Sequence, residues 1–165
     1  MKHRLILFTL LLHLAPLQAE DKGGYRVMVQ KTTLERDDTR GNGYYDDRID
    51  RTLGLKVAIT NVSMKEKAEA TVDYTIIVSR WSYSPNRYEK YTGTEKLSAL
   101  KQQKSAELTL GKARIGGYAN YANQKYQDKV EGWQIIINEP GMPPVSLQSG
   151  SSFKHMAEKS VKPTE

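Results

Sequence analysis

Residues 55–78 contain two runs in which apolar and polar side chains alternate, separated by a short charged segment. Successive side chains of a β-strand point to opposite faces, so strict alternation predicts strands with one buried and one solvated face. The first run belongs to a strand over residues 53–61 and the second to a strand over residues 70–81. The lysines and glutamates between them suit a solvated turn. This segment therefore predicts two neighbouring strands, either sequential in an antiparallel sheet or bridging two sheets.

The two-residue period recurs along the chain, whereas the helical period is almost absent. Further apolar faces are formed by Tyr25, Val27 and Val29, by Ala106, Leu108 and Leu110, by Trp133, Ile135 and Ile137, and by Val145 and Leu147. Six or seven short strands of this kind fit two sheets packed face to face. We therefore predict an all-β fold, an immunoglobulin-like or fibronectin-like antiparallel β-sandwich of about seven strands, over residues 20–153. Residues 154–165 have little apolar content, and we expect a flexible C-terminal tail with at most a short helix.

The first nineteen residues have the layout of a secretory signal peptide. Lys2 and Arg4 precede a short apolar run, and Ala19 supplies a small residue where cleavage is expected. The run of about ten residues is too short to cross a hydrocarbon core of about 30 Å as a helix. We expect residues 1–19 to be removed, although cleavage after Ala15 is an alternative. The mature chain is then secreted or periplasmic and has no transmembrane segment.

The charge balance does not indicate a nucleic-acid partner. Removal of the leader lowers the net charge from +6 to about +4, which alone identifies no partner. Lysines and glutamates are interleaved in residues 65–70 and 88–96, so no continuous basic stripe forms. The chain has no cysteine, and its stability must therefore come from packing. The length of residues 20–165 suits one domain with its own core.

The residue types that most catalytic and metal sites require are scarce in the mature sequence. Two of the three histidines lie in the leader, which leaves His155 in the expected tail. One histidine without cysteine cannot form a zinc cluster, and a catalytic triad would need that histidine in a packed shell. Glycines at residues 41–43 and 116–117 lack the context of a phosphate loop and are interpreted as turns. We expect no enzyme activity, no cofactor and no metal.

Residues 36–51 have the most unusual composition in the chain. Their aspartates could supply the oxygen ligands that calcium prefers, but the spacing does not match a D-x-D-x-D-G loop. Arginines lie among these acids and would neutralise them. We interpret the segment as a mobile, self-compensated surface loop, with calcium binding as the open alternative. The residues concerned are Asp37, Asp38, Asp46, Asp47 and Asp50, with Arg36, Arg40, Arg48 and Arg51.

Tyrosine is abundant, and all ten tyrosines follow the leader. A tyrosine ring with its polar hydroxyl suits interfaces and sugar platforms, and it equally suits the rims of sheets. One aromatic group surrounds the expected turn at residues 84–87, and a second occurs over residues 118–126. We predict that the first group forms a surface for a protein partner or for self-association, with a glycan as the alternative ligand. Its members are Trp81, Tyr83, Arg87, Tyr88 and Tyr91.

Three stretches of the chain show a resemblance to a known group of proteins. KVAITNVSMKEKAEATVDYTIIV, KSAELTL and KVEGWQIII with PVSLQSGSSF resemble small secreted immunoglobulin-like β-sandwiches of verrucomicrobial bacteria. One member of that group, in Akkermansia, is encoded in a type IV pilus gene cluster. The two strands of residues 55–78 are also similar to bacterial adhesion-type and fibronectin-type modules. The resemblance covers about residues 51–153 and implies a non-enzymatic envelope or pilus-associated role, with no residue-level site.

Three classes of function remain open at this stage. The favoured one is an interaction or structural module of the bacterial envelope whose aromatic residues contact another protein. A carbohydrate-binding module for mucin-type glycans would need aromatic rings in a flat exposed row. A hydrolase would need a carboxylate pair in a cleft, for which Asp46, Asp47 and Asp50 are the clustered candidates.

Overall fold

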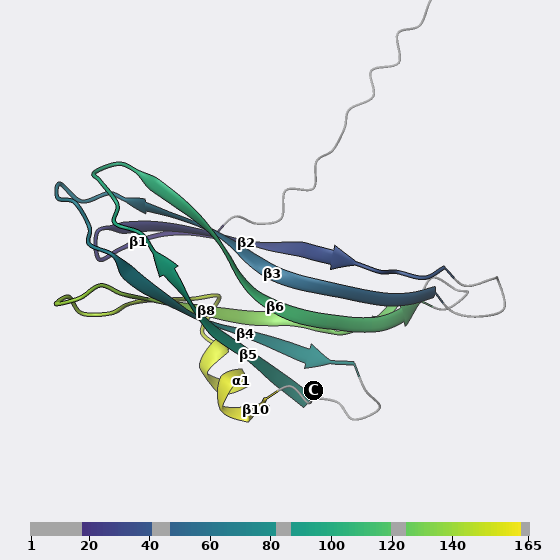
Figure 1. Ribbon diagram of the computed structural model, residues 1–165. Coiled ribbons are helices and arrows are strands. Elements are labelled where there is room, and N and C mark those ends of the chain that lie inside the picture. The colour runs from purple at the N-terminus through teal and green to yellow at the C-terminus, as the bar shows by residue number, and fades with distance from the viewer. Residues whose placement is uncertain (1–17, 41–46, 82–86, 120–124, 163–165) are drawn as a thin grey trace, which may run out of the picture.

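Two β-sheets pack face to face and give the protein two layers (Figure 1). The computed structural model describes residues 18–40, 47–81, 87–119 and 125–162. In these ranges the chain forms ten strands and one short helix. The predicted all-β antiparallel sandwich is therefore confirmed.

The first sheet has the strand order β1-β2-β3-β6-β7. All of its neighbouring strands are antiparallel. The central pair, β3 and β6, supplies the longest strands of the molecule, with fifteen residues each. The bounds are β1 (Gln18–Lys22), β2 (Tyr25–Arg36), β3 (Asp47–Asn61), β6 (Ser105–Ala119) and β7 (Lys125–Gln127).

The second sheet has the strand order β10-β5-β4-β8-β9. The edge strand β10 is parallel to β5, and the other neighbours are antiparallel. The helix α1 (Phe153–Lys159) lies on the side of this sheet that faces away from the first sheet (Figure 1). The strand bounds are β4 (Ala70–Arg80), β5 (Arg87–Leu97), β8 (Lys129–Asn138), β9 (Val145–Gln148) and β10 (Ser160–Val161).

The core lies between the two sheets and is built from the apolar faces that the alternation predicts. Trp133 shares this face with Ile135 and Ile137, and all three are buried. Burial of such side chains is the main favourable term in folding. The other large buried contributors are Tyr25, Val27, Leu55, Val57, Ile59, Val72, Ile76, Leu97 and Leu110.

A β-bulge in β6 extends this strand well beyond the segment that alternation predicts. Leu55 pairs with Leu110 and Leu53 with Ala113, so Gly111 and Lys112 together oppose one residue of β3. Gly111 has φ +76°, and a Cβ there would lie 2.5 Å from Cδ1 of Ile76. Because of the extra residue in the bulge, Ala113 and Ile115 point into the core as Leu110 does. β6 then continues through residues 116–117. The interpretation of these two glycines as a turn is therefore wrong.

The outer face of the second sheet carries a small apolar contact with α1. Ile77 is fully buried although its neighbours on that face are polar, and it pairs with Gly132 of β8. A Cβ built on Gly132 would lie 3.2 Å from both the Phe153 ring and the Met156 methyl group. Phe153 is itself buried. Residues 154–161, expected to form a flexible tail, instead complete α1 and add β10 to the sheet.

Four strands were not expected from the sequence. β5 has polar residues on both faces, and β7 and β10 have only three and two residues. β1 starts at Gln18 and overlaps the expected leader, so cleavage after Ala19 would leave its last three residues to pair with β2. No helix in the described ranges has the length and apolar character needed to cross a bilayer.

Replacement of Trp133 by alanine should lower the free energy of unfolding by about 3 to 5 kcal/mol, because it leaves a large cavity between the sheets. Chemical denaturation of the purified protein measures this change. Met64→Ala is the control, because this side chain is 85% exposed and its loss should cost less than about 0.5 kcal/mol. Equal stability of the two variants would contradict a buried Trp133.

Phe153→Ala should lower the free energy of unfolding by about 3 kcal/mol, because it removes the ring that covers the outer face at Gly132. Lys154→Ala, an exposed change on the same helix, is the matched control. Denaturation curves that coincide for both variants would show that α1 does not pack on the sheet.

Candidate interaction site

Three strand connections leave the sandwich at the same end. Strand pairing places Arg80 opposite Arg87, and Ala119 opposite both Asp47 and Lys125. The connections β2–β3, β4–β5 and β6–β7 therefore start at one end of the two layers (Figure 1). The connecting residues 41–46, 82–86 and 120–124 lie outside the described ranges.

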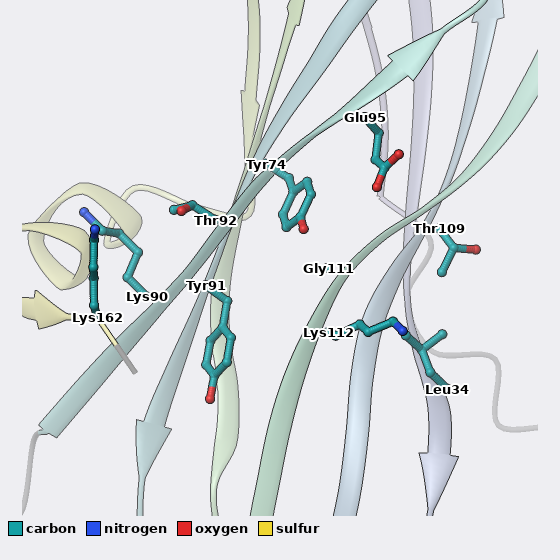
Figure 2. Close-up of a pocket in the computed structure, with 10 residues that line it drawn as sticks. All are labelled: Leu34, Tyr74, Lys90, Tyr91, Thr92, Glu95, Thr109, Gly111, Lys112 and Lys162. Carbon is teal, nitrogen blue, oxygen red and sulfur yellow. The ribbon is translucent and has the colours of Figure 1, made fainter. Parts of the chain in front are cut away.

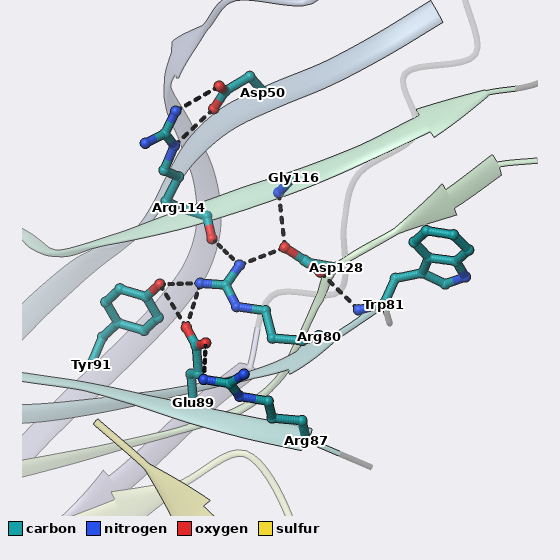
Figure 3. Close-up of polar contacts among 9 residues, drawn as sticks. All are labelled: Asp50, Arg80, Trp81, Arg87, Glu89, Tyr91, Arg114, Gly116 and Asp128. Carbon is teal, nitrogen blue, oxygen red and sulfur yellow. Dashed lines mark hydrogen bonds and ion pairs between the residues drawn. The ribbon is translucent and has the colours of Figure 1, made fainter. Parts of the chain in front are cut away.

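Arg80, the last residue of β4, is the centre of a buried polar cluster at this end (Figure 3). Its Nη1 donates to the carbonyl oxygen of Arg114 at 2.8 Å and to Oδ2 of Asp128. Its Nη2 donates to Oε2 of Glu89 and to the hydroxyl of Tyr91. The side chains of Glu89 and Asp128 are only 8% and 9% exposed. The Arg80 side chain is itself only partly exposed, at 19%, and its charge is tolerated there because charged and neutral acceptors surround it.

Asp128 connects this cluster to the backbone of Trp81, which follows β4, and of Gly116 in β6. It lies between β7 of the first sheet and β8 of the second sheet. Its Oδ1 accepts the N–H of Trp81 at 2.8 Å, and its Oδ2 accepts the N–H of Gly116 at 2.9 Å. Its own N–H donates to the carbonyl oxygen of Gly116 at 2.9 Å. One carboxylate thus fixes the ends of β4 and β6 relative to the point where the chain changes sheets.

The contacts of the cluster shift the pKa values of Arg80 and Tyr91. Burial alone would lower the pKa of Arg80, but its hydrogen bonds to Glu89 and Asp128 raise that pKa above its ordinary value. Burial, together with the Glu89 carboxylate, raises the pKa of Tyr91 against the opposing effect of Arg80. Arg80 therefore stays charged and Tyr91 stays neutral across the physiological pH range. These properties suit a positioning element rather than a proton-transfer site.

Arginine is concentrated at this end of the molecule. The chain has nine arginines, and seven of them lie on the strands and connections that meet here. The guanidinium-bearing side chains of Arg48 and Arg114 are 70% and 71% exposed. The seven are Arg36, Arg40, Arg48, Arg51, Arg80, Arg87 and Arg114.

Aspartates of the predicted self-compensated segment pair with these arginines. Arg114 binds both carboxylate oxygens of Asp50, and Arg48 approaches the same group at 3.4 Å. Asp38 accepts from Arg51 and, at 2.7 Å, from Arg36. The hydrogen bond from Arg51 outweighs desolvation and lowers the pKa of Asp38 to about 2.

The described residues contain no group of three or more histidine or carboxylate side chains placed to hold a metal ion. Asp46, one of the acids considered for calcium and for a hydrolase pair, lies outside the described ranges.

Three aromatic rings from two sheets pack against one another beside the polar cluster. The Trp81 ring centroid lies 4.8 Å from Tyr118, at an interplanar angle of 86°, and 5.2 Å from Tyr126, at 49°. The two tyrosine rings lie 5.1 Å apart. Such edge-on and tilted packing adds stabilisation beyond area burial. We call Arg48, Trp81, Arg87, Arg114, Tyr118 and Tyr126 the arginine-aromatic end.

The structure divides the predicted binding residues into separate places. Tyr83 lies outside the described ranges. Tyr88 and Tyr91 are three positions apart on β5 and therefore point to opposite faces of the sheet. They cannot form one continuous surface. Trp81 joins Tyr118 and Tyr126 instead, and Arg87 is exposed beside Glu89, with Nη2 at 3.7 Å from Oε1.

Sequence reasoning missed Arg80, Glu89 and Asp128, because a polar residue that will be buried resembles a solvated one in the sequence. The second tyrosine group, over residues 118–126, did contain a signal for the aromatic packing.

A hollow of about 300 Å³ opens between the two sheets at this end. Its lining includes Arg48, Ile49, Asp50, Arg80, Arg114, Gly116, Gly117 and Asp128.

Arg80→Ala should lower the free energy of unfolding by about 3 to 5 kcal/mol, because Asp128 would remain buried without its cation and Glu89 would keep only Arg87, at 3.7 Å. Arg26→Ala removes an arginine from an exposed ion pair with Asp21 and should leave stability almost unchanged. Thermal and chemical denaturation of both variants measure the difference. If Arg80→Ala costs no more stability than Arg26→Ala, the cluster is open to water.

No protein-family model matches the chain, and no curated protein matches it. A crystal structure of a protein from Akkermansia muciniphila is similar to this chain at a TM-score of 0.38 and 13% sequence identity. The similarity covers 88% of this chain and 84% of that one. A likeness of this extent assigns no activity, ligand or partner.

Proposed function

We propose that the protein is a non-enzymatic, protein-binding module of the bacterial envelope that contacts its partner through the arginine-aromatic end. The observation that carries this proposal is the concentration of arginine, tryptophan and tyrosine at one end of the sandwich. Arginine, tyrosine and tryptophan are the residue types enriched in the hot spots of protein interfaces.

The rigidity of this end supports a binding role. Trp81 and Gly116 are held through their backbone N–H groups by Asp128, which is itself buried. Binding groups on a fixed scaffold lose little conformational entropy when a partner docks. The exposed guanidiniums of Arg48 and Arg114 can donate to carboxylates of a partner in competition with Asp50.

The ring geometry favours a protein over a glycan as the ligand. A flat sugar platform needs rings that lie in one plane, whereas Trp81 and Tyr118 are nearly perpendicular. The angle between the two tyrosine rings is 36°. A carbohydrate-binding module remains the alternative outcome of the experiment below.

The carboxylates of the described residues support a non-enzymatic role. Where the environment shifts a carboxyl pKa, as at Asp38, Asp50 and Glu139, the hydrogen bonds from basic side chains lower it. A general acid in a hydrolase pair needs a raised carboxyl pKa.

The proposal that the protein is exported rests on the expected leader. An association with a pilus rests on the resemblance to the verrucomicrobial β-sandwiches.

Arg48→Ala combined with Arg87→Ala should weaken partner binding while the protein stays folded, because both side chains are exposed. In the experiment, immobilised wild-type protein is used to capture partners from solubilised envelopes of the producing bacterium. The captured partner is then purified, and its affinity for each variant is measured by calorimetry. The double variant should lose about tenfold or more in affinity, as for hot-spot arginines.

Lys101→Ala combined with Lys104→Ala is the control, because it removes the same charge from exposed positions before β6, at the opposite end. It should keep wild-type affinity. Equal affinities for the two double variants would exclude the arginine-aromatic end as the contact surface. Binding to mucin-type glycans alone would replace the proposal with a carbohydrate-binding module.

A further inference from the structure

Within the described ranges, β5 pairs with a second strand on its outer side at only two residues. β5 lies between β4 and β10, and β10 pairs only with Tyr88 and Glu89. Among the described strands, none covers the edge of β5 from Lys90 to Leu97. An uncovered edge strand can accept a strand from another chain.

A groove between the two sheets runs beside this edge (Figure 2). It has a volume of about 550 Å³ and opens between β5 and β6. The rings of Tyr74 and Tyr91 extend from the second sheet toward β6, and Leu34 lies across the groove in the first sheet (Figure 2). A Cβ on Gly93 would lie 2.3 Å from the Tyr74 hydroxyl, so this glycine allows the Tyr74 ring to cross β5.

The geometry of a strand decides what the groove would accept. A strand paired with the β5 edge would point every second side chain into the groove and the others to the outer face. The inward side chains would meet Tyr74, Tyr91 and Leu34, which favours apolar residues. The pairing of β10 shows that this edge accepts a strand, since Ser160 and Val161 already pair with Tyr88 and Glu89.

The charges around the edge favour acidic outward side chains. Lys90 and Lys96 share the outer face of β5, and Lys162 follows β10 beside Lys90 in the groove lining (Figure 2). Lys112 of β6 adds a further positive charge to the groove lining. Glu95 is the one acidic residue in that lining. Opposite charges across neighbouring strands stabilise their pairing.

A second copy of the chain is a poor occupant in the register centred on the middle of the uncovered edge. Antiparallel pairing of two β5 strands about Gly93 would place Lys90 of each copy opposite Lys96 of the other. Like charges directly opposite one another destabilise a sheet, and edge lysines protect proteins from such self-association.

We propose that the β5 edge binds an extended acidic segment of a partner protein as an added strand, with alternate apolar side chains in the groove. This surface lies along the side of the sandwich and is separate from the proposed contact at the arginine-aromatic end. Its occupant is recognised by backbone pairing, by apolar side chains over Tyr74 and Tyr91, and by acidic groups near Lys90 and Lys96.

The test uses the mature chain and two synthetic peptides of about eight residues, a common strand length. One alternates glutamate with valine, and the other alternates lysine with valine. The acidic peptide should bind and slow amide hydrogen exchange over residues 90–97, as followed by NMR, whereas the basic peptide should do neither. Lys90→Glu combined with Lys96→Glu should weaken the acidic peptide about tenfold or more and allow the basic peptide to bind.

Lys101→Glu combined with Lys104→Glu is the matched control and should leave peptide affinity within about twofold of wild type, because both side chains are exposed and neither lines the groove. Should the charge-reversed β5 variant fail to fold, Lys112→Glu offers the same comparison from β6. Equal binding of both peptides, or exchange unchanged over residues 90–97, overturns the proposal. Protection that grows with protein concentration would assign the edge to a second copy, and protection lost on deleting residues 163–165 would assign it to the chain's own C-terminus.

Discussion

The charge of Arg80, partly buried between two sheets, is the constraint on which one end of the molecule depends. A partly buried guanidinium loses much of its hydration, and the structure replaces that hydration with Glu89, Asp128, the Tyr91 hydroxyl and the Arg114 carbonyl oxygen. These partners belong to different elements of both sheets. The position of each strand end is therefore tied to the others through one side chain. Such a cluster specifies the arrangement of the elements, whatever it adds to stability.

A second buried ion pair closes the opposite end of the sandwich. The Nζ of Lys67 lies 3.0 Å from Oε2 of Glu139, and both side chains are about nine-tenths buried. The Tyr25 hydroxyl, from the first sheet, donates to the same carboxylate oxygen, and Lys67 lies over the Tyr25 ring. The apolar core is thus bounded by a hydrogen-bonded charge cluster at each end. The Arg80 end differs because exposed arginines and packed aromatic rings surround it, which makes it the better candidate for recognition.

Local alternation was sufficient to predict the strands that build the core, but not the strands or contacts at its margins. Val57, Val72 and Ile135 could be assigned to the inside because their neighbours on either side face outward and are mostly polar. β5 has no such contrast, since Glu89 lies on the inward face as the buried partner of Arg80 on the neighbouring strand. The bulge at Gly111 interrupts the period of β6, so its second half could not be recognised. Ile77 is an apolar residue on the otherwise polar outer face of β4. It was the sequence feature that indicated that another element, here α1, covers this face.

The sequence predicts which end of the sheet carries Trp81 and Arg87, but not which residues gather around them. Trp81 and Arg87 lie at the expected end, whereas the grouping of Trp81 with Tyr118 and Tyr126 requires knowledge of which strands are neighbours across the two sheets. Nothing in the local sequence distinguishes Asp128, whose role follows from its position where the chain passes from one sheet to the other.

Amide hydrogen exchange at Trp81 and Gly116 tests most directly whether the buried cluster fixes this end of the sandwich. Both N–H groups donate to Asp128, so in the wild-type protein they should exchange as slowly as amides of the central strands. In Asp128→Ala these two amides should exchange much faster, while the amides of Ile135 and Val57 keep their protection. Rapid exchange of Trp81 and Gly116 in the wild-type protein would contradict a rigid, prearranged end.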